Sequence, residues 1–280
     1  MKYQQALKIA EQKLIEQNIE DASIDAWLLM EHITGMSRAR YYVDCFSEMS
    51  EEQEKAYFEC IEKRMHRIPL QHITGVQEFM GLIFSVNEHV LVPRQDTEIL
   101  VESVDKLVKN KEASVLDMCT GSGCIAISLK VRNPQISCTA VDISDEALKM
   151  AVKNAQNHQC DIKFIKSDMF TDVDGEFDII VSNPPYIPTH VIEELEEEVR
   201  LHDPFGALDG KEDGLYFYRI LASESKHYLK NNGKIYMEIG HDQSESVEKL
   251  LKEAGFEEIR TQKDLAGLDR VVYGVYNKHS

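Results

Sequence analysis

The stretch VLDMCTGSGCIAI at residues 115–127 decides the fold. Its apolar first part is typical of a buried strand, its small residues are typical of a turn, and its apolar last part begins a helix. Glycines in such a turn let the backbone approach a ligand closely, and the helix start offers N–H groups that have no partner within the helix. The stretch therefore predicts a ligand site at the carboxyl edge of an open α/β sheet.

A second strand ends in a carboxylate farther along the chain. The stretch 138–142 ends in Asp142, about 20 residues after the turn, which is the usual position of an acid that takes a ribose hydroxyl pair. A nucleoside-bearing cofactor is therefore expected. The turn departs from the dinucleotide fingerprint G-x-G-x-x-G, and Asp117 before it would repel a pyrophosphate but could hold an ammonium group. S-adenosylmethionine (SAM) fits these residues better than NAD.

A polar loop follows the apolar strand predicted at residues 177–182. In this loop, Asn183-Pro184-Pro185-Tyr186, the prolines lack N–H groups, so the loop offers carbonyl acceptors, to which Asn183 adds a side-chain carbonyl and Tyr186 an aromatic face. Such a pocket suits a planar group with an NH2, which would donate to the Asn183 oxygen and to the Pro184 carbonyl. The structural alternative is a rigid strand-to-loop turn, because Asn-Pro and Pro-Pro are common in loops.

Composition narrows the class of substrate. The 280 residues include 31 Lys and Arg against 49 Asp and Glu, a net charge of −18. A chain of this charge repels a polyanion unless basic residues concentrate in a stripe, and the sequence contains no such stripe. Direct binding of free DNA or RNA is therefore disfavoured. The acidic run 193–198 is expected to be a solvated helix face rather than a docking device.

Cysteine spacing and hydropathy predict neither a metal site nor a membrane span. The six cysteines form no Cys-x-x-Cys pair, and there is no His-Glu-x-x-His motif, so neither a disulfide framework nor a zinc site is indicated. No apolar stretch reaches membrane-spanning length, and the first residues lack the apolar core of a signal peptide. A cytoplasmic enzyme is the expectation.

Hydrophobic spacing divides the chain into three parts. Residues 1–72 have the apolar spacing of helices, and Ile24 is expected on the apolar face of one of them. A helix is expected to end near Gly35, and a capping box at Ser50 and Gln53 predicts the start of another. Apolar and polar residues alternate within residues 73–94, which predicts a β-hairpin connector with a turn near Asn87-Glu88. Residues 95–280 alternate between strands and helices, which predicts a doubly wound sheet with strands near 115, 138, 162, 177, 234, 256 and 271.

Four stretches and a tail motif make the chain resemble class I SAM-dependent methyltransferases, and specifically the release factor glutamine methyltransferases of the HemK/PrmC family. The stretches are HITGVQEF at 72–79, VPRQDTE at 92–98, the turn at 117–123 and VSNPPYI at 181–187, and the tail motif lies around Asp203-Pro204, Ala207-Leu208 and Asp213-Gly214-Leu215. The chain departs from the family at two positions. Cys119 and Gln95 replace a usual glycine and proline.

The resemblance implies a fold and an activity. Residues 95–280 would form a Rossmann-like, seven-stranded methyltransferase domain, and residues 1–72 a helical substrate-recognition domain. The enzyme would methylate the side-chain amide of the glutamine in the Gly-Gly-Gln motif of peptide chain release factors, modulating translation termination and releasing S-adenosyl-L-homocysteine. Two alternatives stay open. One is a nucleic-acid exocyclic-amine methyltransferase, and the other is a non-catalytic or NAD-binding module on the same scaffold.

The expected site combines a substrate pocket with a cofactor cradle. Asn183 and Pro184 would be catalytic, and Pro185, Tyr186 and Arg94 would line the substrate site, although Arg94 could instead form an interdomain ion pair. No histidine is assigned as a base, because a methylated amide cation is acidic enough to lose its proton. The expected cofactor-binding residues are Asp117, Cys119, Thr120, Gly121, Ser122, Gly123, Asp142, Asp168, Met169 and Asn183.

Overall fold

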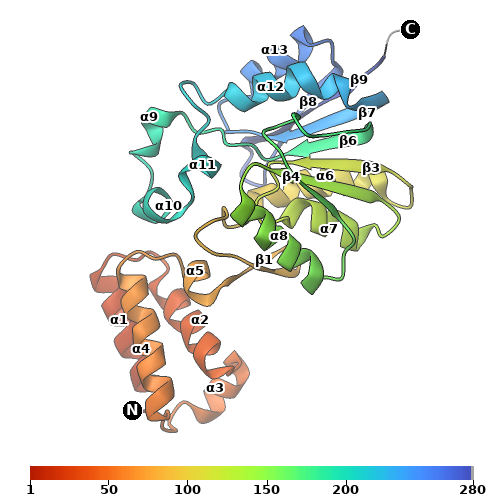
Figure 1. The fold of residues 1–280 in the computed structure, drawn as a ribbon. Helices are drawn as coiled ribbons and strands as arrows, with labels where there is room; N and C mark the ends of the chain where they lie inside the picture. Colours follow the sequence, from red (N-terminus) through yellow and green to blue (C-terminus); the bar gives the residue numbers. More distant parts are fainter. Residues whose placement is uncertain (279–280) are drawn as a thin grey trace. The chain divides into compact units, whose positions relative to one another are not determined.

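The computed structural model describes residues 1–278. These residues form two compact units (Figure 1). The first, which we call the helical unit, consists of Met1–Val76 together with Glu197–His202. The second, which we call the sheet unit, is the rest of the described chain. Among residues 1–278, no helix is both long and apolar enough to cross a membrane.

The helical unit is a small bundle with its own apolar core. Its helices are α1 (Tyr3–Glu16), α2 (Ala22–Thr34), α3 (Arg38–Asp44), α4 (Glu51–Met65), α5 (Leu70–Thr74) and α10 (Glu197–His202). As predicted, α4 begins at a capping box formed by Ser50 and Gln53, and α2 ends at Gly35. The predicted inward position of Ile24 is wrong, since this side chain is 53% exposed. The neighbouring Asp25 faces inward instead, because α4 supplies a buried partner for it in Arg64.

The acidic run 193–198 is only partly the solvated face that its composition predicts. Its first four residues include exposed glutamates, and Glu193 follows the end of α9 (Thr189–Ile192). Glu198 lies on α10 and is half-buried, with its Oε1 atom 2.5 Å from Nη2 of Arg64. Charge pairing with a buried arginine therefore overrides the tendency of this glutamate to stay in water.

The sheet unit contains the seven strands expected from the sequence. They are β3 (Ser114–Met118), β4 (Ser137–Asp142), β5 (Lys163–Lys166), β6 (Phe177–Ser182), β7 (Leu229–Glu238), β8 (Glu257–Lys263) and β9 (Asp269–Tyr276). Their order across the sheet is β5-β4-β3-β6-β7-β9-β8. The first five are parallel, and β9 is antiparallel to both of its neighbours. The order reverses at β3 and β6, so the turn after β3 and the loop after β6 lie side by side at one edge.

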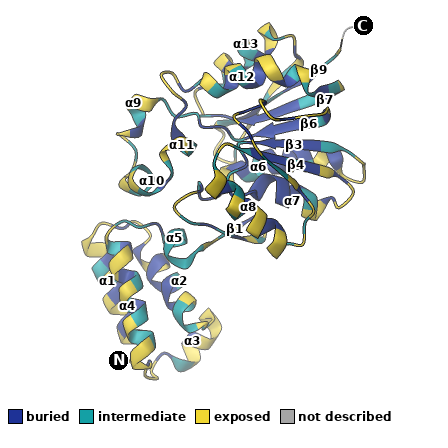
Figure 2. Cartoon of the chain, in the orientation of Figure 1, coloured by how far each residue is buried: buried dark blue, intermediate teal, exposed yellow. Residues whose placement is uncertain are grey.

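Helices cover both faces of the sheet, whose central strands are largely buried (Figure 2). One core lies between the sheet and α6 (Gln95–Val108), α7 (Cys124–Arg132) and α8 (Asp145–Asn157). The other lies between the opposite face and α12 (Tyr216–Glu224) and α13 (Ser244–Glu253). Val115 belongs to the first core and Leu116 to the second, as the period of a strand requires. The short helices α9 and α11 (Phe205–Leu208) follow the polar loop after β6.

The connector is a hairpin of β1 (Val76–Phe79) and β2 (Leu82–Ser85). Its turn lies at Met80-Gly81, not near Asn87-Glu88 as the sequence predicted. Both turn residues have positive φ, 53° and 75°, which matches the tight two-residue turns that suit the twist of a hairpin. The alternation of apolar residues changes phase here, because Phe79 and Leu82 are three residues apart, and this shift was the sequence signal for the turn.

Candidate active site

The turn after β3 leaves open space where a ligand could approach. Gly121 has φ +55°, and a Cβ added there would meet nothing within 4 Å. Gly123 has φ +81°, but its Cβ would lie 2.9 Å from Ile127 Cδ1 and 3.1 Å from Ala151 Cβ. Gly121 therefore provides access to the backbone, whereas Gly123 is required by the close packing of α7 against α8. Ser122 is buried between them.

Asp117 is a fully buried carboxylate at the end of β3. Its Oδ2 atom accepts hydrogen bonds from Thr120 Oγ1 at 2.6 Å and from the Ala126 backbone N–H at 3.2 Å. Its Oδ1 atom is buried without a hydrogen-bond partner among the described residues. Burial raises the pKa of Asp117 to about 7, against the opposing effect of these two donors. An unpartnered buried oxygen beside the glycine turn suits a cationic group, such as the ammonium group of SAM.

Asp142 ties the end of β4 to the same turn. Its Oδ2 atom accepts from the Gly121 N–H at 2.9 Å, and its Oδ1 atom accepts from the Ser144 N–H at 2.9 Å. Burial raises the pKa of this carboxyl group. Each oxygen retains capacity for a second hydrogen bond, so the carboxylate is held in position while it can still accept from a ribose hydroxyl pair.

Cys119 and Met169 come together although 50 residues separate them. The Cys119 Sγ atom lies 4.0 Å from the Met169 Sδ atom. Both residues have left-handed backbone conformations, with φ of 63° and 49°. The left-handed conformation explains why a glycine is usual at position 119 in the family that the sequence resembles. The side chain of Asp168 is exposed beside them.

Two side-chain hydrogen bonds hold the loop after β6 in place. Ser182 donates through Oγ to the Met118 carbonyl at 2.7 Å, which fixes β6 against the end of β3. Asn183 donates through Nδ2 to Thr97 Oγ1 at 3.2 Å. Since Nδ2 is used by the protein, Oδ1 is the atom that Asn183 can offer to a ligand. Pro184 and Pro185 are buried, which makes the loop rigid.

Two further side chains support this loop, and their roles were not predicted from the sequence. Gln243 donates through Nε2 to the Tyr186 carbonyl at 2.9 Å and accepts from the Gly240 N–H at 2.9 Å. Thr97 is buried at the start of α6 and accepts the Asn183 hydrogen bond. Thr97 belongs to a stretch that marks the family resemblance, but no pattern within that stretch assigns it to the loop.

Glu238 is a buried carboxylate at the end of β7. Burial raises its pKa to about 7, while hydrogen bonds from Thr97 and Asn183 and the charge of Arg270 act in the opposite direction. The rule that identified Asp142 could have identified this residue as well. Both end apolar strands at the carboxyl edge of the sheet.

Arg94 does not form an ion pair between the two units. Its Nη2 atom lies 2.7 Å from Oδ2 of the buried Asp203, and both residues belong to the sheet unit. The arginine remains about half exposed. It therefore joins the loop region around α11 to the start of α6, and its free surface is available to a substrate.

A hollow of about 710 Å³ lies elsewhere, at the amino ends of the parallel strands. Two of its charged residues satisfy each other, since Asp178 accepts from the Ser114 N–H at 2.7 Å and from Lys230 Nζ at 2.7 Å. The hollow is thus on the edge opposite to the glycine turn. Within residues 1–278, no group of three or more His, Cys, Asp or Glu side chains is placed to hold a metal ion.

Comparisons with known proteins agree with this geometry. Residues 5–75 match a family model described as the PrmC N-terminal domain, and residues 94–199 match the methyltransferase small domain. The release factor glutamine methyltransferase of Caulobacter vibrioides is 42% identical over 96% of this chain and 94% of its own length. The protein of the same name from Streptococcus pneumoniae is 40% identical over 97% and 98%.

Solved structures share the fold at lower identity. A methyltransferase from Pyrococcus furiosus has a TM-score of 0.56 and 16% identity, and the match covers 78% of this chain and 100% of that one. The hMettl16 catalytic domain has a TM-score of 0.59 and 15% identity, over 82% and 84% of the two chains. At such identities the likeness shows the Rossmann-like fold alone.

Proposed function

The chain belongs to the release factor glutamine methyltransferase family, and we propose that it transfers a methyl group from SAM to the side-chain amide nitrogen of the glutamine in the Gly-Gly-Gln motif of peptide chain release factors. The observation that carries the proposal is the position of Asn183-Pro184-Pro185-Tyr186. This loop directly follows β6, beside the glycine turn after β3. An acceptor for an NH2 group therefore lies next to a cradle that suits SAM.

The cofactor residues divide the work of holding SAM. When bound, SAM supplies a methyl group on a positively charged sulfur. Asp117 would accept from the ammonium group, the open turn at Gly121 and Thr120 would face the methionine portion, and Asp142 would accept from the ribose hydroxyls. Asp168 and Met169 would flank the adenine.

The protein must overcome the poor nucleophilicity of an amide nitrogen, whose lone pair is delocalised into the carbonyl. Accepting one N–H at Asn183 Oδ1 and the other at the Pro184 carbonyl would hold the nitrogen in line with the methyl group and favour tetrahedral character. Orientation of this kind is worth up to about 7–11 kcal/mol in favourable intramolecular models. No general base is needed before transfer, because the methylated amide cation is strongly acidic.

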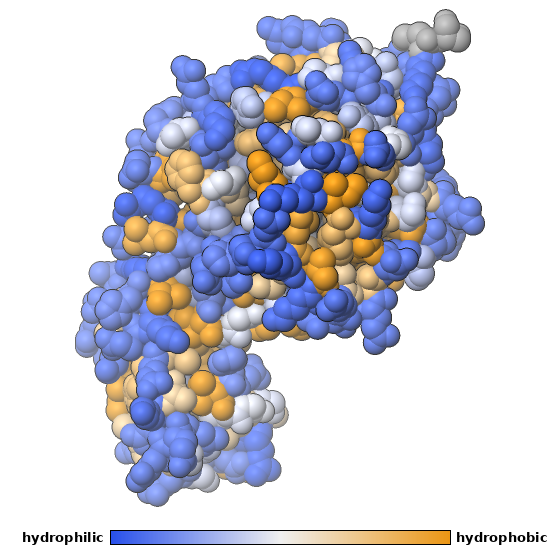
Figure 3. All heavy atoms as spheres, viewed as in Figure 1, coloured by the Kyte–Doolittle hydropathy of each residue, from blue (hydrophilic) through white to orange (hydrophobic). Residues whose placement is uncertain are grey.

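The helical unit is proposed to recognise the release factor. It contributes none of the cofactor residues, yet Tyr42, Val43 and Phe46 at α3 are exposed apolar side chains. Tyr42 and Val43 lie in the last turn of α3, and Phe46 lies in the turn that follows it. Apolar atoms reach the surface of this unit between hydrophilic ones (Figure 3). We call these three side chains the α3 patch and propose that it contacts the folded protein substrate.

The function is tested by locating the methyl group. The protein is incubated with isotopically labelled SAM and a purified release factor, and in parallel with RNA and DNA. Mass spectrometry should find the label on the glutamine amide of the Gly-Gly-Gln motif and none on nucleic acid. A release factor whose glutamine is replaced by asparagine is the control. Label on an exocyclic base amine, with an unmodified release factor, would establish the alternative instead.

The role of the α3 patch is tested separately with Tyr42→Ser and Phe46→Ser. Ile15→Ser is a matched control, because Ile15 is also an exposed apolar residue of this unit, on α1. Loss of one apolar contact of about 1–3 kcal/mol should lower kcat/KM for the release factor by roughly 5- to 150-fold. SAM affinity should not change. Equal effects at Ile15 and at the patch would remove the patch from the interface.

A further inference from the structure

We propose that Thr97 and Glu238 form a one-way hydrogen-bond chain that fixes which end of the Asn183 amide faces the substrate. In this arrangement both are positioning residues, since they act through Asn183 and touch no reacting atom. The inference rests on the proposed function, because it concerns the acceptor that would bind the glutamine amide. It adds two residues to the site, one from α6 and one from β7.

Strand pairing brings Asn183 and Glu238 together. In the parallel pair of β6 and β7, Ser182 is in register with Met237. The next residue on each strand is therefore Asn183 on one and Glu238 on the other, at the same edge of the sheet. Thr97 lies in the first turn of α6, which packs against β7. Thr97 and Glu238 are each only 2% exposed.

The number of protons that each group can donate determines the direction of this hydrogen-bond chain. A threonine hydroxyl has one proton to donate, whereas an ionised carboxylate can only accept. Thr97 Oγ1 accepts from Asn183 Nδ2, the Thr97 hydroxyl donates in turn to the Glu238 carboxylate, and this carboxylate also accepts from Asn183. If the Asn183 amide were reversed, its oxygen would face a hydroxyl whose proton is already used. The Asn183 oxygen is consequently directed to the substrate side.

Glu238 is not held by a direct ion pair that would explain its burial. Its Oε2 atom has no hydrogen-bond partner among the described residues, and the nearby Tyr218 hydroxyl donates to its backbone carbonyl at 2.9 Å. Arg270 lies close enough to affect Glu238 electrostatically. Its Nη2 atom, however, pairs with Asp96 and Asp264, each at 3.1 Å.

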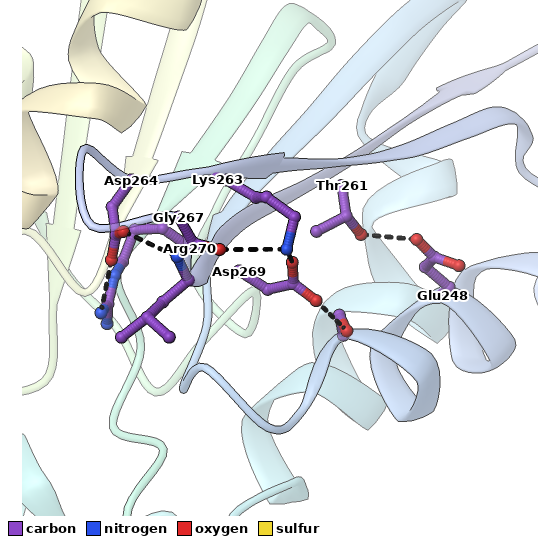
Figure 4. A network of polar contacts seen from close by, with 9 residues as sticks. Glu248, Thr261, Lys263, Asp264, Gly267, Asp269 and Arg270 are labelled. Atoms are coloured by element: carbon purple, nitrogen blue, oxygen red, sulfur yellow. Dashed lines mark hydrogen bonds and ion pairs between the residues drawn. The ribbon is translucent and has the colours of Figure 1, made fainter.

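Among the described residues, the ion pairs of this arginine are thus made with aspartates and not with Glu238. Figure 4 shows Arg270 and Asp264 facing each other at the β8–β9 hairpin, within a set of polar contacts that also includes Lys263 and Asp269. A buried carboxylate without its own counter-ion lowers stability. Such a residue at a sheet edge is therefore more readily explained by a role in the site than by a role in folding.

The hydrogen-bond chain also predicts that kcat depends on pH. A protonated Glu238 could donate to Thr97, which would reverse the chain and turn the Asn183 N–H groups toward the substrate N–H groups. The groups that face Glu238 electrostatically are Arg270 of β9, Asp96 of α6, Tyr186 of the loop, Tyr218 of α12 and Cys124 of α7. Because burial raises the pKa of Glu238 to about 7, kcat should fall as the pH drops through neutrality.

The test distinguishes the hydrogen bonds of the Thr97 hydroxyl from the packing of the Thr97 side chain. Thr97→Val keeps the shape and removes the hydroxyl, Thr97→Ser keeps the hydroxyl, and Glu238→Met removes the final acceptor. Thr97→Val and Glu238→Met should lower kcat by roughly 10- to 100-fold, less than the loss of a group that contacts the reacting atoms. KM and SAM affinity should stay within about twofold. Thr97→Ser should restore most of kcat.

Two further results would identify a shared chain. The double variant Thr97→Val/Glu238→Met should be no slower than the slower single variant, because both changes break the same chain. The fall of kcat at acid pH should also be absent from Glu238→Met at saturating SAM. A normal kcat in Thr97→Val, an equal loss in Thr97→Ser, or multiplicative losses in the double variant would overturn the proposal. If Glu238→Met does not fold, the two Thr97 variants decide alone.

A measurement without turnover keeps this inference distinct from the proposed function. In ¹⁵N-labelled protein, the Asn183 side-chain amide signal is identified by its loss in Asn183→Asp. Its protons should be more protected from solvent exchange in the wild type and in Thr97→Ser than in Thr97→Val. Failure of the wild type to methylate glutamine would refute the function, whereas an unprotected amide in the wild type would refute the hydrogen-bond chain.

Discussion

In the helical unit, the buried Asp25 lies 2.6 Å from a buried arginine, Arg64, which also pairs with Glu198. In the sheet unit, the hydrogen-bond donors to the buried Asp117 and Glu238 are neutral among the residues that the structure describes. Burial raises the pKa of all three carboxyl groups, and it brings Asp117 and Glu238 to about 7. The contrast indicates that a paired buried charge belongs to the architecture, whereas an unpaired one belongs to the site.

The largest effect is expected from removing the arginine that pairs with the buried Asp25. Arg64→Ala leaves Asp25 buried without a counter-ion, which should lower the stability of the helical unit by about 3–5 kcal/mol. Chemical denaturation followed by the fluorescence of Trp27, the single tryptophan, measures this loss. The double variant Asp25→Leu/Arg64→Met should recover most of it, because no unpaired charge remains buried. A loss below about 1 kcal/mol, typical of exposed pairs, would contradict the assignment.

Asn183→Ala tests the sheet unit, at the residue that is proposed to bind the reacting amide. It removes an acceptor whose interaction strengthens as the amide nitrogen becomes electron-poor in the transition state. The expected loss is roughly 10²–10³ in kcat, about 2.7–4 kcal/mol, with a smaller change in SAM affinity. Asn183→Asp keeps an oxygen but loses the N–H that Thr97 accepts, so we expect partial activity at best. Near-normal kcat in Asn183→Ala would show that the loop is only a rigid turn.

Asp142→Ala concerns a carboxylate that is held in place by backbone N–H groups. We expect SAM binding to weaken by about 1.5–3 kcal/mol, the range for hydrogen bonds to a charged group. Asp142→Asn should lose less, because it retains one acceptor. Asp145→Ala is a matched control, since this exposed aspartate lies three residues farther on and pairs with Lys166 at the surface. Calorimetry that finds equal affinities for Asp142→Ala and the control would remove Asp142 from the site.

The parts of this site that the sequence predicted depend on local patterns. The turn after β3, the acid that ends β4 and the polar loop after β6 each follow an apolar strand, so their placement at one sheet edge could be inferred before any coordinates. The contacts of Thr97 and Glu238 depend instead on how α6 and β7 pack beside β6. Those elements are far apart in the chain, and no spacing rule relates them. The hairpin turn at Met80-Gly81 was missed although the apolar alternation shifts by one residue between Phe79 and Leu82.

The pH dependence of SAM binding distinguishes the two unpaired carboxylates. Asp117 should hold the ammonium group only when ionised, so SAM affinity should rise as the pH increases through the raised pKa of about 7. Below that pKa, the change can reach about tenfold per pH unit, or 1.4 kcal/mol. Asp117→Asn should bind SAM more weakly and without this dependence. Glu238→Gln should keep it, and if it does not, Glu238 rather than Asp117 controls the cofactor.

The smallest expected effect concerns Cys119, whose left-handed φ of 63° puts a side chain where a glycine would be unstrained. Cys119→Gly should relieve about 1–2 kcal/mol of backbone strain. It should also add about 0.5–1 kcal/mol of unfolded-state entropy and remove the contact with Met169. We therefore expect thermal stability to change by less than about 1 kcal/mol, with unchanged SAM affinity. If the variant instead lost SAM binding, the Cys119 side chain would belong to the cofactor site and would not merely be tolerated in the turn.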